Sequence, residues 1–386
     1  MLQDYSFIYT SYIYIITMVC MVMVALPYLK TYRSDKLCSV GYHNQIKLCS
    51  IIVISIIFGL VFGMRWDVGT DNLEYLRIYV QNDTERYKNE FIFKLLNDSF
   101  KTFGIHYWIY FTIFASVQIF LLLYSIKNMA YLWVFVILSL FGGHFFIDWM
   151  NGMRQEMASC IMFLGTNYII TRNPFKYFLL IILAIGFHSS AVIFIVVYPL
   201  LVNGRSFVPS RLCQILLLVV SSAITLIVGD ILSHIFPILD ILQQMDSGEG
   251  YASRYNTNVL ESYAEKTHIG IMFYVFFIIN ALVILYYKKL KLYFSGRRFT
   301  IYYNMYFWGM ICETLLATNM ILIRPFRYFR IYKLILIAYL LYYLYKHPSS
   351  LSAFIFLVLL SILLISIFIK ASTTPFNFYF EIPYAP

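Results

Sequence analysis

Charged residues are scarce in this sequence. Asp, Glu, Lys and Arg together make up 12% of the 386 residues, whereas hydrophobic residues make up 61%. Because soluble domains carry roughly a quarter charged residues, this balance excludes an ordinary soluble domain. Repeated apolar runs of about 20 residues match the thickness of a bilayer, so the sequence predicts an all-α, polytopic membrane protein.

Motifs for metal or nucleotide chemistry are also missing. The six cysteines show no CxxC spacing, which argues against disulfides and against a zinc site. The sequence contains no DxD-type pair, P-loop, GxSxG or HExxH motif. We therefore expect no metal and no other cofactor. No basic leader precedes the first apolar run, so we expect a retained helix there rather than a cleaved signal.

Ten apolar runs are clear, and an eleventh is ambiguous. The clear runs are Phe7 to Leu26, Ile46 to Gly63, Ile105 to Ile126, Ala130 to Ile147, Met153 to Ile170, Leu212 to Leu232, Ile269 to Tyr287, Phe299 to Thr318, Ile331 to Tyr345 and Leu351 to Ile369. The ambiguous run, Tyr177 to Leu201, has about 25 residues. It is long enough to cross once with tilt, or to turn at His188 and cross back as two short helices.

The distribution of the net charge of +10 favours the second alternative. Short loops rich in Lys and Arg stay on the cytoplasmic side. A double crossing places the basic loop Lys288 to Arg298 inside with the other basic turns, which then hold about half of all Lys and Arg and a single acid, Asp35. The sequence thus predicts a single membrane domain, 1–386, of about 12 segments with both termini outside. His188 then lies at the outer turn of a hairpin of short helices. One tilted helix with a hydrogen-bonded core histidine is the alternative.

Two long loops face the outside in this arrangement. In the first, 64–104, apolar residues recur at helical spacing from Glu90 to Phe103, which predicts an amphipathic helix on the membrane surface. The second, 233–268, combines turn residues with mixed charge and is expected to be a flexible lid. Since the inner loops carry no comparable polar variety, we expect the chemistry on the outer face.

Arg154 is placed against local helix preference. It lies in the first turn of an outward-starting helix, where the helix dipole disfavours a cation. A phosphate or diphosphate bound by the guanidinium and the free N–H groups of the helix start resolves this conflict, with Gly152 allowing close approach. An arginine that extends to the membrane interface, or that forms a structural ion pair with Asp148 or Glu156, is an equally good explanation.

Three arginines, Arg324, Arg327 and Arg330, recur in steps of three residues. Pro325 suits the first turn of a helix, and this spacing leaves the three cations on one arc. Cations so placed repel one another unless an anion lies against them, and a diphosphate is a suitable one. A surface belt that binds anionic lipid head groups is the alternative.

Several residues are candidates for a general base. His188 is set within an apolar run, has an ordinary pKa near neutrality, and can take a proton from a sugar hydroxyl or bond a phosphate. Asp67, Asp71, Glu90 and Asp148 are the other candidates, although Asp67 and Asp71 also fit a turn or cap, and Asp148 an ion pair. Glu313 lies within a span, where it is either functional or paired with an outer arginine.

At these residues the sequence resembles the EpsG family, the Wzy-type polymerases of bacterial exopolysaccharide and O-antigen. The matching residues are Arg65 with Gly69, Asp71 and Tyr75; Glu90; Asn151-Gly152 with Arg154-Gln155 and Ala158; Ala184 with His188, Ser190 and Ala191; and the arginines before Tyr328. Two positions depart from the family pattern: Phe91 follows Glu90 where the family often has proline, and Leu73-Glu74 stands where it often has Asn or Tyr.

The resemblance implies a GT-C-like helical scaffold in the bacterial plasma membrane. There the protein would join undecaprenyl-diphosphate-linked oligosaccharides on the outer face, transferring the growing glycan to a hydroxyl of the next lipid-linked unit. The implied partners are this donor and acceptor, membrane lipids and a chain-length regulator, with no nucleic acid. The implied catalytic residues are His188, Arg154, Asp71, Glu90 and Asp148. The residues expected to bind diphosphate or substrate are Arg65, Gln155, Arg254, Arg324, Arg327, Arg330 and Tyr328.

Two other functions would use similar residues. An O-antigen ligase belongs to the same enzyme class, whereas a flippase for lipid-linked sugars belongs to a different one. A flippase exposes substrate-binding charge to both faces in turn, and here the polar variety is expected on one face only. The sequence also lacks a tandem repeat and a matched pair of broken helices, which argues against a transporter built on inverted repeats.

Overall fold

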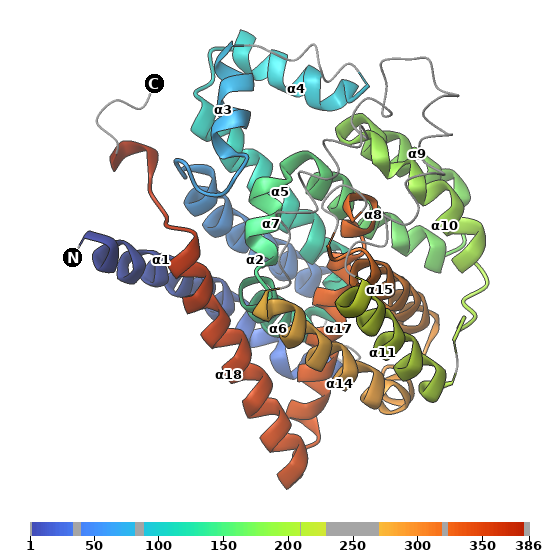
Figure 1. Cartoon of the computed structure of the whole chain (residues 1–386). Coiled ribbons are helices and arrows are strands. Elements are labelled where there is room, and N and C mark those ends of the chain that lie inside the picture. The colour runs from blue at the N-terminus through green and yellow to red at the C-terminus, as the bar shows by residue number, and fades with distance from the viewer. Residues whose placement is uncertain are drawn as a thin grey trace. The chain divides into compact units, whose positions relative to one another are not determined.

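The computed structural model describes residues 2–33, 40–81, 89–208, 210–228, 270–318 and 323–381. Regular structure in these ranges is helical apart from an isolated bridge between Arg65 and Phe378, so the expected all-α fold is confirmed. Figure 1 shows the helices coloured along the chain. They form two compact units, which are described separately: 1–203 with 337–386, and 204–336. A single membrane domain over 1–386 stays a prediction.

The first unit contains most of the helices. They are α1 (Leu2–Ala25), η1 (Leu26–Arg33), α2 (Val40–Gly63), α3 (Asn72–Gln81), α4 (Phe91–Thr102), α5 (Tyr107–Ser125), η3 (Lys127–Leu132), α6 (Trp133–Gly142), α7 (Phe145–Asn151), α8 (Met153–Ile170), α9 (Pro174–Phe187), η4 (Ser189–Ile193), α10 (Phe194–Leu201), the end of α17 (Arg330–Lys346), α18 (Ser350–Thr373) and η7 (Tyr379–Glu381).

Glycines allow close packing around the buried helices of this unit. A Cβ atom at Gly59 or Gly63 of α2 would collide with Ser116 or Thr112 of α5, so the two helices lie in close contact. α8 packs against α5 and α9 and is buried along most of its length. Because α8 is covered on several sides, its position is fixed, and its first turn carries Arg154.

The two ends of the first unit differ in character. At the Arg154 end, α5 and α8 begin and α2, α9 and α18 finish; here Arg65 Nη2 donates to Met150 O at 3.1 Å. At the opposite, Lys127 end, Asn167 Nδ2 donates to Ser125 O at 3.1 Å. Lys127 and Arg172, from described basic turns of this unit, lie at the Lys127 end. The separation of polar loops from basic turns that the sequence predicted is therefore present within the unit.

The apolar run from Ala130 to Ile147, expected as one span, is broken. α6 and α7 meet at an angle of 66°. Beside the break α6 packs closely on α18, because a Cβ atom at Gly142 would collide with Leu363. His144 then takes a left-handed backbone conformation with φ 59°, and its Nε2 atom lies 2.7 Å from Ser366 O.

The ambiguous run from Tyr177 to Leu201 forms two short helices. α9 ends at Phe187, His188 is extended, and η4 and α10 follow. The two helices pack as a hairpin, since Tyr177 Oη donates to Phe194 O at 2.9 Å and the rings of Tyr177 and Tyr198 lie 5.1 Å apart. The predicted break at His188 is confirmed.

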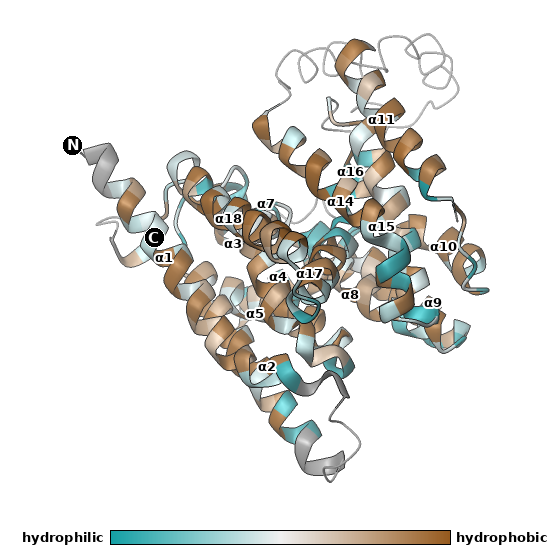
Figure 2. Ribbon diagram, turned by 90° about the horizontal axis from the view of Figure 1, so that it is seen from below, coloured by the Kyte–Doolittle hydropathy of each residue, from teal (hydrophilic) through white to brown (hydrophobic). Residues whose placement is uncertain are grey.

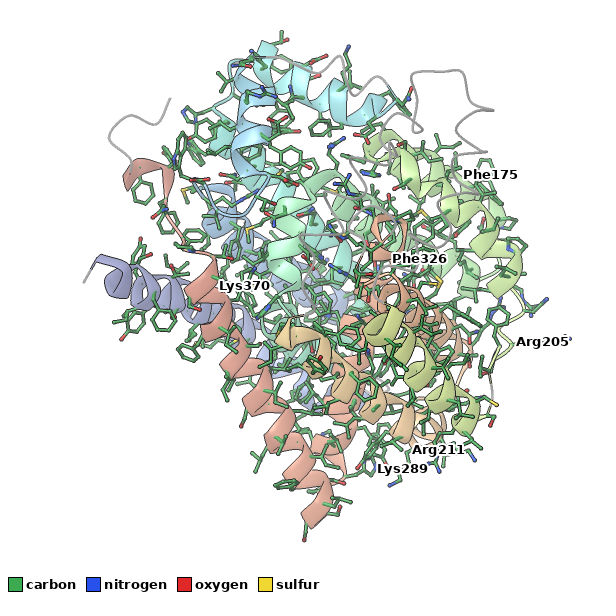
Figure 3. The ribbon with its side chains drawn as sticks, viewed as in Figure 1. Phe175, Arg205, Arg211, Lys289, Phe326 and Lys370 are labelled. Atoms are coloured by element: carbon green, nitrogen blue, oxygen red, sulfur yellow. The ribbon has the colours of Figure 1, made fainter. Side chains whose placement is uncertain are left out.

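The second unit contains α11 (Arg211–Val228), α14 (Ile271–Tyr293), α15 (Arg297–Leu315), α16 (Arg324–Arg327) and the start of α17. Arg211 Nη1 donates to Leu285 O at 3.4 Å, so α11 begins beside the end of α14. Figure 3 labels Arg211 and Lys289 at these neighbouring ends. The two inner basic loops predicted from the sequence thus lie at the same end of this unit.

Among the residues that the structure describes, five helices are long and apolar enough to cross a membrane, and a sixth span is added if α6 and α7 form one broken span. The five are Ser6–Lys30, Asn44–Gly63, Tyr107–Ser125, Ile271–Tyr293 and Ser350–Thr373. In Figure 2 long stretches of α2, α11 and α14 have the hydrophobic colour. The chain is a multi-pass membrane protein; about 12 crossings and a GT-C-like scaffold stay predictions.

Candidate functional site

The candidate site is built around an ion pair between Arg154 and Glu90. Arg154 lies in the first turn of α8, and Glu90 is the N-cap residue of α4. The Nη1 atom of Arg154 donates to Oε2 of Glu90, and the two side chains are 16% and 8% exposed. This carboxylate comes from a segment 64 residues away, so it was not among the two partners considered from the sequence. It supplies the anion that Arg154 needs at a helix N-terminus.

Two aromatic rings line the pair. The guanidinium carbon of Arg154 lies 5.3 Å from the ring centre of Phe93 and 5.8 Å from that of Tyr75. These rings come from α4 and α3, and both are buried. At such distances the rings stabilise a cation and exclude water. Arg154 is therefore held as a cation in a mostly apolar setting, where its attraction for an anion is stronger than in water.

Arg65 holds the start of α8 in place. It is 1% exposed, and its Nη2 atom donates to Met150 O at 3.1 Å and contacts Met153 Sδ at 3.3 Å. Burial lowers the pKa of Arg65 from 12.5 to about 10, so it stays protonated at neutral pH. Its position is that of a residue that orients the turn before Arg154.

Gly69 explains how the loop after α2 approaches the same turn. Its φ is +87°, and a Cβ atom there would collide with the side chain of Asn151. Only glycine combines this backbone conformation with such close contact. The loop therefore packs on the junction between α7 and α8.

His188 lies at the end of α9, beside the start of α4. Its Nδ1 atom lies 2.8 Å from Ser190 Oγ, and the side chain is half-buried. α4 packs on α9 so closely that a Cβ atom at Gly186 would lie 2.6 Å from Ile92. Glu90 and His188 thus sit on adjoining ends of two packed helices.

The other predicted residues of the first unit lie around this centre. Gln155 is buried in α8, and Asp71 is exposed before α3, where its carbonyl accepts from Tyr75 N at 3.0 Å. This position fits the turn or cap role considered from the sequence. Asp148, in α7, interacts electrostatically with Lys370 of α18 and with His144. Figure 3 labels Lys370.

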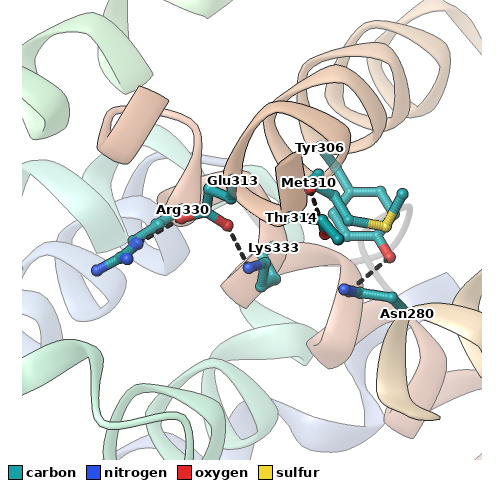
Figure 4. A network of polar contacts seen from close by, with 7 residues as sticks. All are labelled: Asn280, Tyr306, Met310, Glu313, Thr314, Arg330 and Lys333. Atoms are coloured by element: carbon teal, nitrogen blue, oxygen red, sulfur yellow. Dashed lines mark hydrogen bonds and ion pairs between the residues drawn. The ribbon is translucent and has the colours of Figure 1, made fainter. Parts of the chain in front are cut away.

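The second unit contains a different cluster. Glu313 accepts from Arg330 Nε with one carboxylate oxygen and from Lys333 Nζ with the other (Figure 4). Glu313 and Lys333 are buried, and Lys333 Nζ lies 4.9 Å from the ring centre of Phe276. The pairing of Glu313 with an outer arginine, considered as one alternative, is confirmed. The contact of Lys333 with Glu313 was not predicted, although Lys333 follows Arg330 by about one helical turn.

The arginine repeat is less uniform than the sequence suggested. Arg324 and Arg327 lie in the short α16, and Arg330 begins α17, with Tyr328 and Phe329 in a turn between them. Arg324 is exposed, whereas Tyr328 is fully buried. Arg330 already has a carboxylate partner, so the repulsion among three cations is partly relieved within the protein.

Some predictions lie outside these observations. Arg254 and the second outer loop, 233–268, lie outside the described residues. The meeting of Arg154 and Arg327 in one hollow joins residues of the two units and stays a prediction. Within the described ranges, no group of three or more His, Cys, Asp or Glu residues could hold a metal ion.

Comparison with known proteins gives one match. The model of a family described as the EpsG family matches residues 46–385, which include the ion pair, His188 and the cluster around Glu313. No curated protein and no solved structure matches the chain.

Proposed function

The chain belongs to the EpsG family, and we propose that it is a Wzy-type polymerase that joins lipid-diphosphate-linked oligosaccharides on the outer face of the bacterial plasma membrane. Its donor and acceptor are undecaprenyl-diphosphate-linked repeat units. The growing glycan is transferred to a hydroxyl of the next unit. The charge distribution predicts about 12 crossings. In that topology the Arg154 end of the first unit faces the outside.

The observation that carries this proposal is the pair of Arg154 and Glu90. A shielded guanidinium beside a carboxylate provides both groups that the reaction needs: a cation for a diphosphate and a base for a hydroxyl. The pair lies at the end of the first unit opposite the basic turns, so it faces outward if those turns are cytoplasmic.

The pair also suggests how the reaction begins. The donor diphosphate, with two or more negative charges, competes with Glu90 for Arg154 and releases the carboxylate. Because burial disfavours the charged form of a carboxylate, the released Glu90 is a better proton acceptor. Glu90 takes the proton of the acceptor hydroxyl, whose oxygen attacks the anomeric carbon of the donor.

The bond between that carbon and the diphosphate oxygen then breaks. The lipid diphosphate leaves with the electron pair, and Arg154 stabilises its developing charge. His188, on the adjoining end of α9, is the second group able to take the proton. Arg324 and Arg327 provide further cations for the diphosphate of a lipid-linked substrate.

The test uses a strain that makes its glycan with this protein as sole polymerase. Arg154→Ala should reduce the surface glycan to single repeat units, because the leaving diphosphate loses its cation. Arg77→Ala is the matched control: Arg77 pairs with Glu74 at 3.1 Å, but the two side chains are 50% and 40% exposed. Its glycan should keep the normal length distribution.

Other outcomes identify other functions. Single units trapped on the cytoplasmic side in Arg154→Ala would point to a flippase. Long chains that accumulate on the lipid carrier, without transfer to lipid A core, would point to a ligase. Comparison of Glu90→Gln with His188→Gln shows which of the two residues is the base. The variant that lacks the base should still bind the lipid-linked donor but should no longer polymerise.

A further inference from the structure

A group of aromatic side chains gathers at the Arg154 end of the first unit. Trp66 follows α2, His106 and Trp108 lie at the start of α5, and Tyr379 comes from the segment after α18. The rings of Trp108 and Tyr379 stack at 6.0 Å and 10°, and the ring of His106 lies 5.8 Å from that of Tyr379. We call these four residues the aromatic platform. His106 is exposed and the other three are half-buried.

Backbone hydrogen bonds hold the platform together. Trp66 N donates to Asn377 O at 2.8 Å, and Tyr379 N donates to Met64 O at 3.0 Å. These bonds draw the segment after α18 across the end of α2. Tyr379 is therefore placed by backbone pairing with a distant segment, whereas an aromatic residue of an interfacial belt is usually carried by the spanning helix itself.

The platform lies at the same end of the first unit as the candidate site. Trp66 follows Arg65, whose Nη2 atom donates to Met150 O and contacts Met153 Sδ, and Arg154 comes next in the chain. If Arg154 holds the diphosphate of a ligand, the group attached to that diphosphate lies at the same end of the unit as the platform.

The chemistry of the platform suits a sugar. The flat faces of Trp108 and Tyr379 can pack against the C–H face of a pyranose, while the indole N–H, phenol and imidazole groups can bond its hydroxyls. The platform contains no permanently charged side chain, and burial lowers the pKa of His106 below its ordinary value of 6.5, so it is neutral at pH 7. An uncharged ligand is therefore favoured over an anionic lipid head group.

We propose that the aromatic platform binds the glycan of the lipid-linked donor next to its diphosphate. This inference rests on the proposed function, because it takes Arg154 as the diphosphate site. The ligand of the platform is thus an oligosaccharide. A platform that serves only as a membrane anchor would overturn this inference.

The test uses the full-length protein in lipid nanodiscs and, as probe, the repeat-unit oligosaccharide freed from lipid and diphosphate by mild acid. Isothermal titration should show binding to the wild type, weakened about tenfold in Trp108→Ala and in Tyr379→Ala. Tyr379→Phe keeps the ring and should bind nearly as well as the wild type. Trp308→Ala, which removes a 41% exposed indole from α15, is the matched control and should bind normally.

The proposal is overturned if the wild type does not bind the probe, or if both alanine variants bind it normally. Weaker retention in the bilayer with unchanged binding would identify the platform as a membrane anchor instead. Arg154→Ala should still bind the probe, since the probe lacks a diphosphate. If Arg154→Ala keeps the normal glycan length distribution while the wild type binds the probe, the proposed function fails and the platform proposal stands. The two failures are therefore distinguishable.

Discussion

The pair of Arg154 and Glu90 should make a large contribution to stability that can be measured directly. Its side chains are 16% and 8% exposed, so removal of one partner leaves the other charge mostly buried. Such a loss costs about 3–5 kcal/mol, and the partial exposure of Arg154 places the expected value near about 3 kcal/mol. Arg154→Met or Glu90→Gln should therefore shift the unfolding equilibrium by roughly 150-fold.

A double-mutant cycle isolates the interaction from other effects of each change. In the double variant of Arg154→Met with Glu90→Gln neither charge is left alone, so its loss should be well below the sum of the two single losses. Equilibrium unfolding in mixed micelles provides the measurement. The same cycle on Arg77 and Glu74, an exposed pair, should give a coupling of about 1 kcal/mol or less.

Additive losses at Arg154 and Glu90, or single losses of the size seen at Arg77, would refute the reasoning. The two charges would then be solvated independently. Glu90 would have no reason to be released by a diphosphate, and the proposed start of the reaction would fail with it.

Three further predictions follow from other contacts. In micellar unfolding, Glu313→Gln should lower the free energy of unfolding by about 3 kcal/mol, and Lys333→Met should lower it by less. Only the first change leaves two cations without their shared carboxylate. Gly186→Leu, which directs a side chain at Ile92, should lower polymerisation while leaving the protein in the membrane, as seen by glycan gels beside immunoblots. Since the pKa of His106 is lowered on folding, the unfolded chain takes up its proton first as the pH falls, so stability should decrease below about pH 6.5, and less so in His106→Gln.

Much of the fold follows from hydropathy and charge. The apolar runs became helices because the backbone of an apolar segment satisfies its hydrogen bonds internally in that form. The break at His188 was predicted because length and charge parity both favoured it. The break at His144 was missed, although two consecutive glycines, Gly142 and Gly143, precede it in the sequence.

For the candidate site too, the sequence indicated individual residues but not the contacts between distant segments. The sequence indicated Arg154 and Glu90 separately, the first from helix polarity and the second as a candidate base, but it did not pair them. Their contact depends on how α4 packs against α9, and no local pattern encodes that packing. Arg65 was predicted to bind substrate, and this stays a prediction. Its hydrogen bonds to the backbone carbonyls of Phe62 and Met150 were not predicted, because a residue's type does not reveal which way its side chain points.

The position of Arg154 links stability to function. At a helix start the dipole repels a cation, so Arg154 stays there only while an anion is near, and in the structure that anion is Glu90. In the proposed mechanism a diphosphate replaces Glu90 beside Arg154, and its larger charge offsets the cost of leaving the carboxylate of Glu90 without this partner. Under this proposal the exchange favours substrate over the internal carboxylate and leaves Glu90 ready to take a proton. A site in which Arg154 had no internal partner would bind diphosphate more tightly, but it would not couple that binding to release of the base.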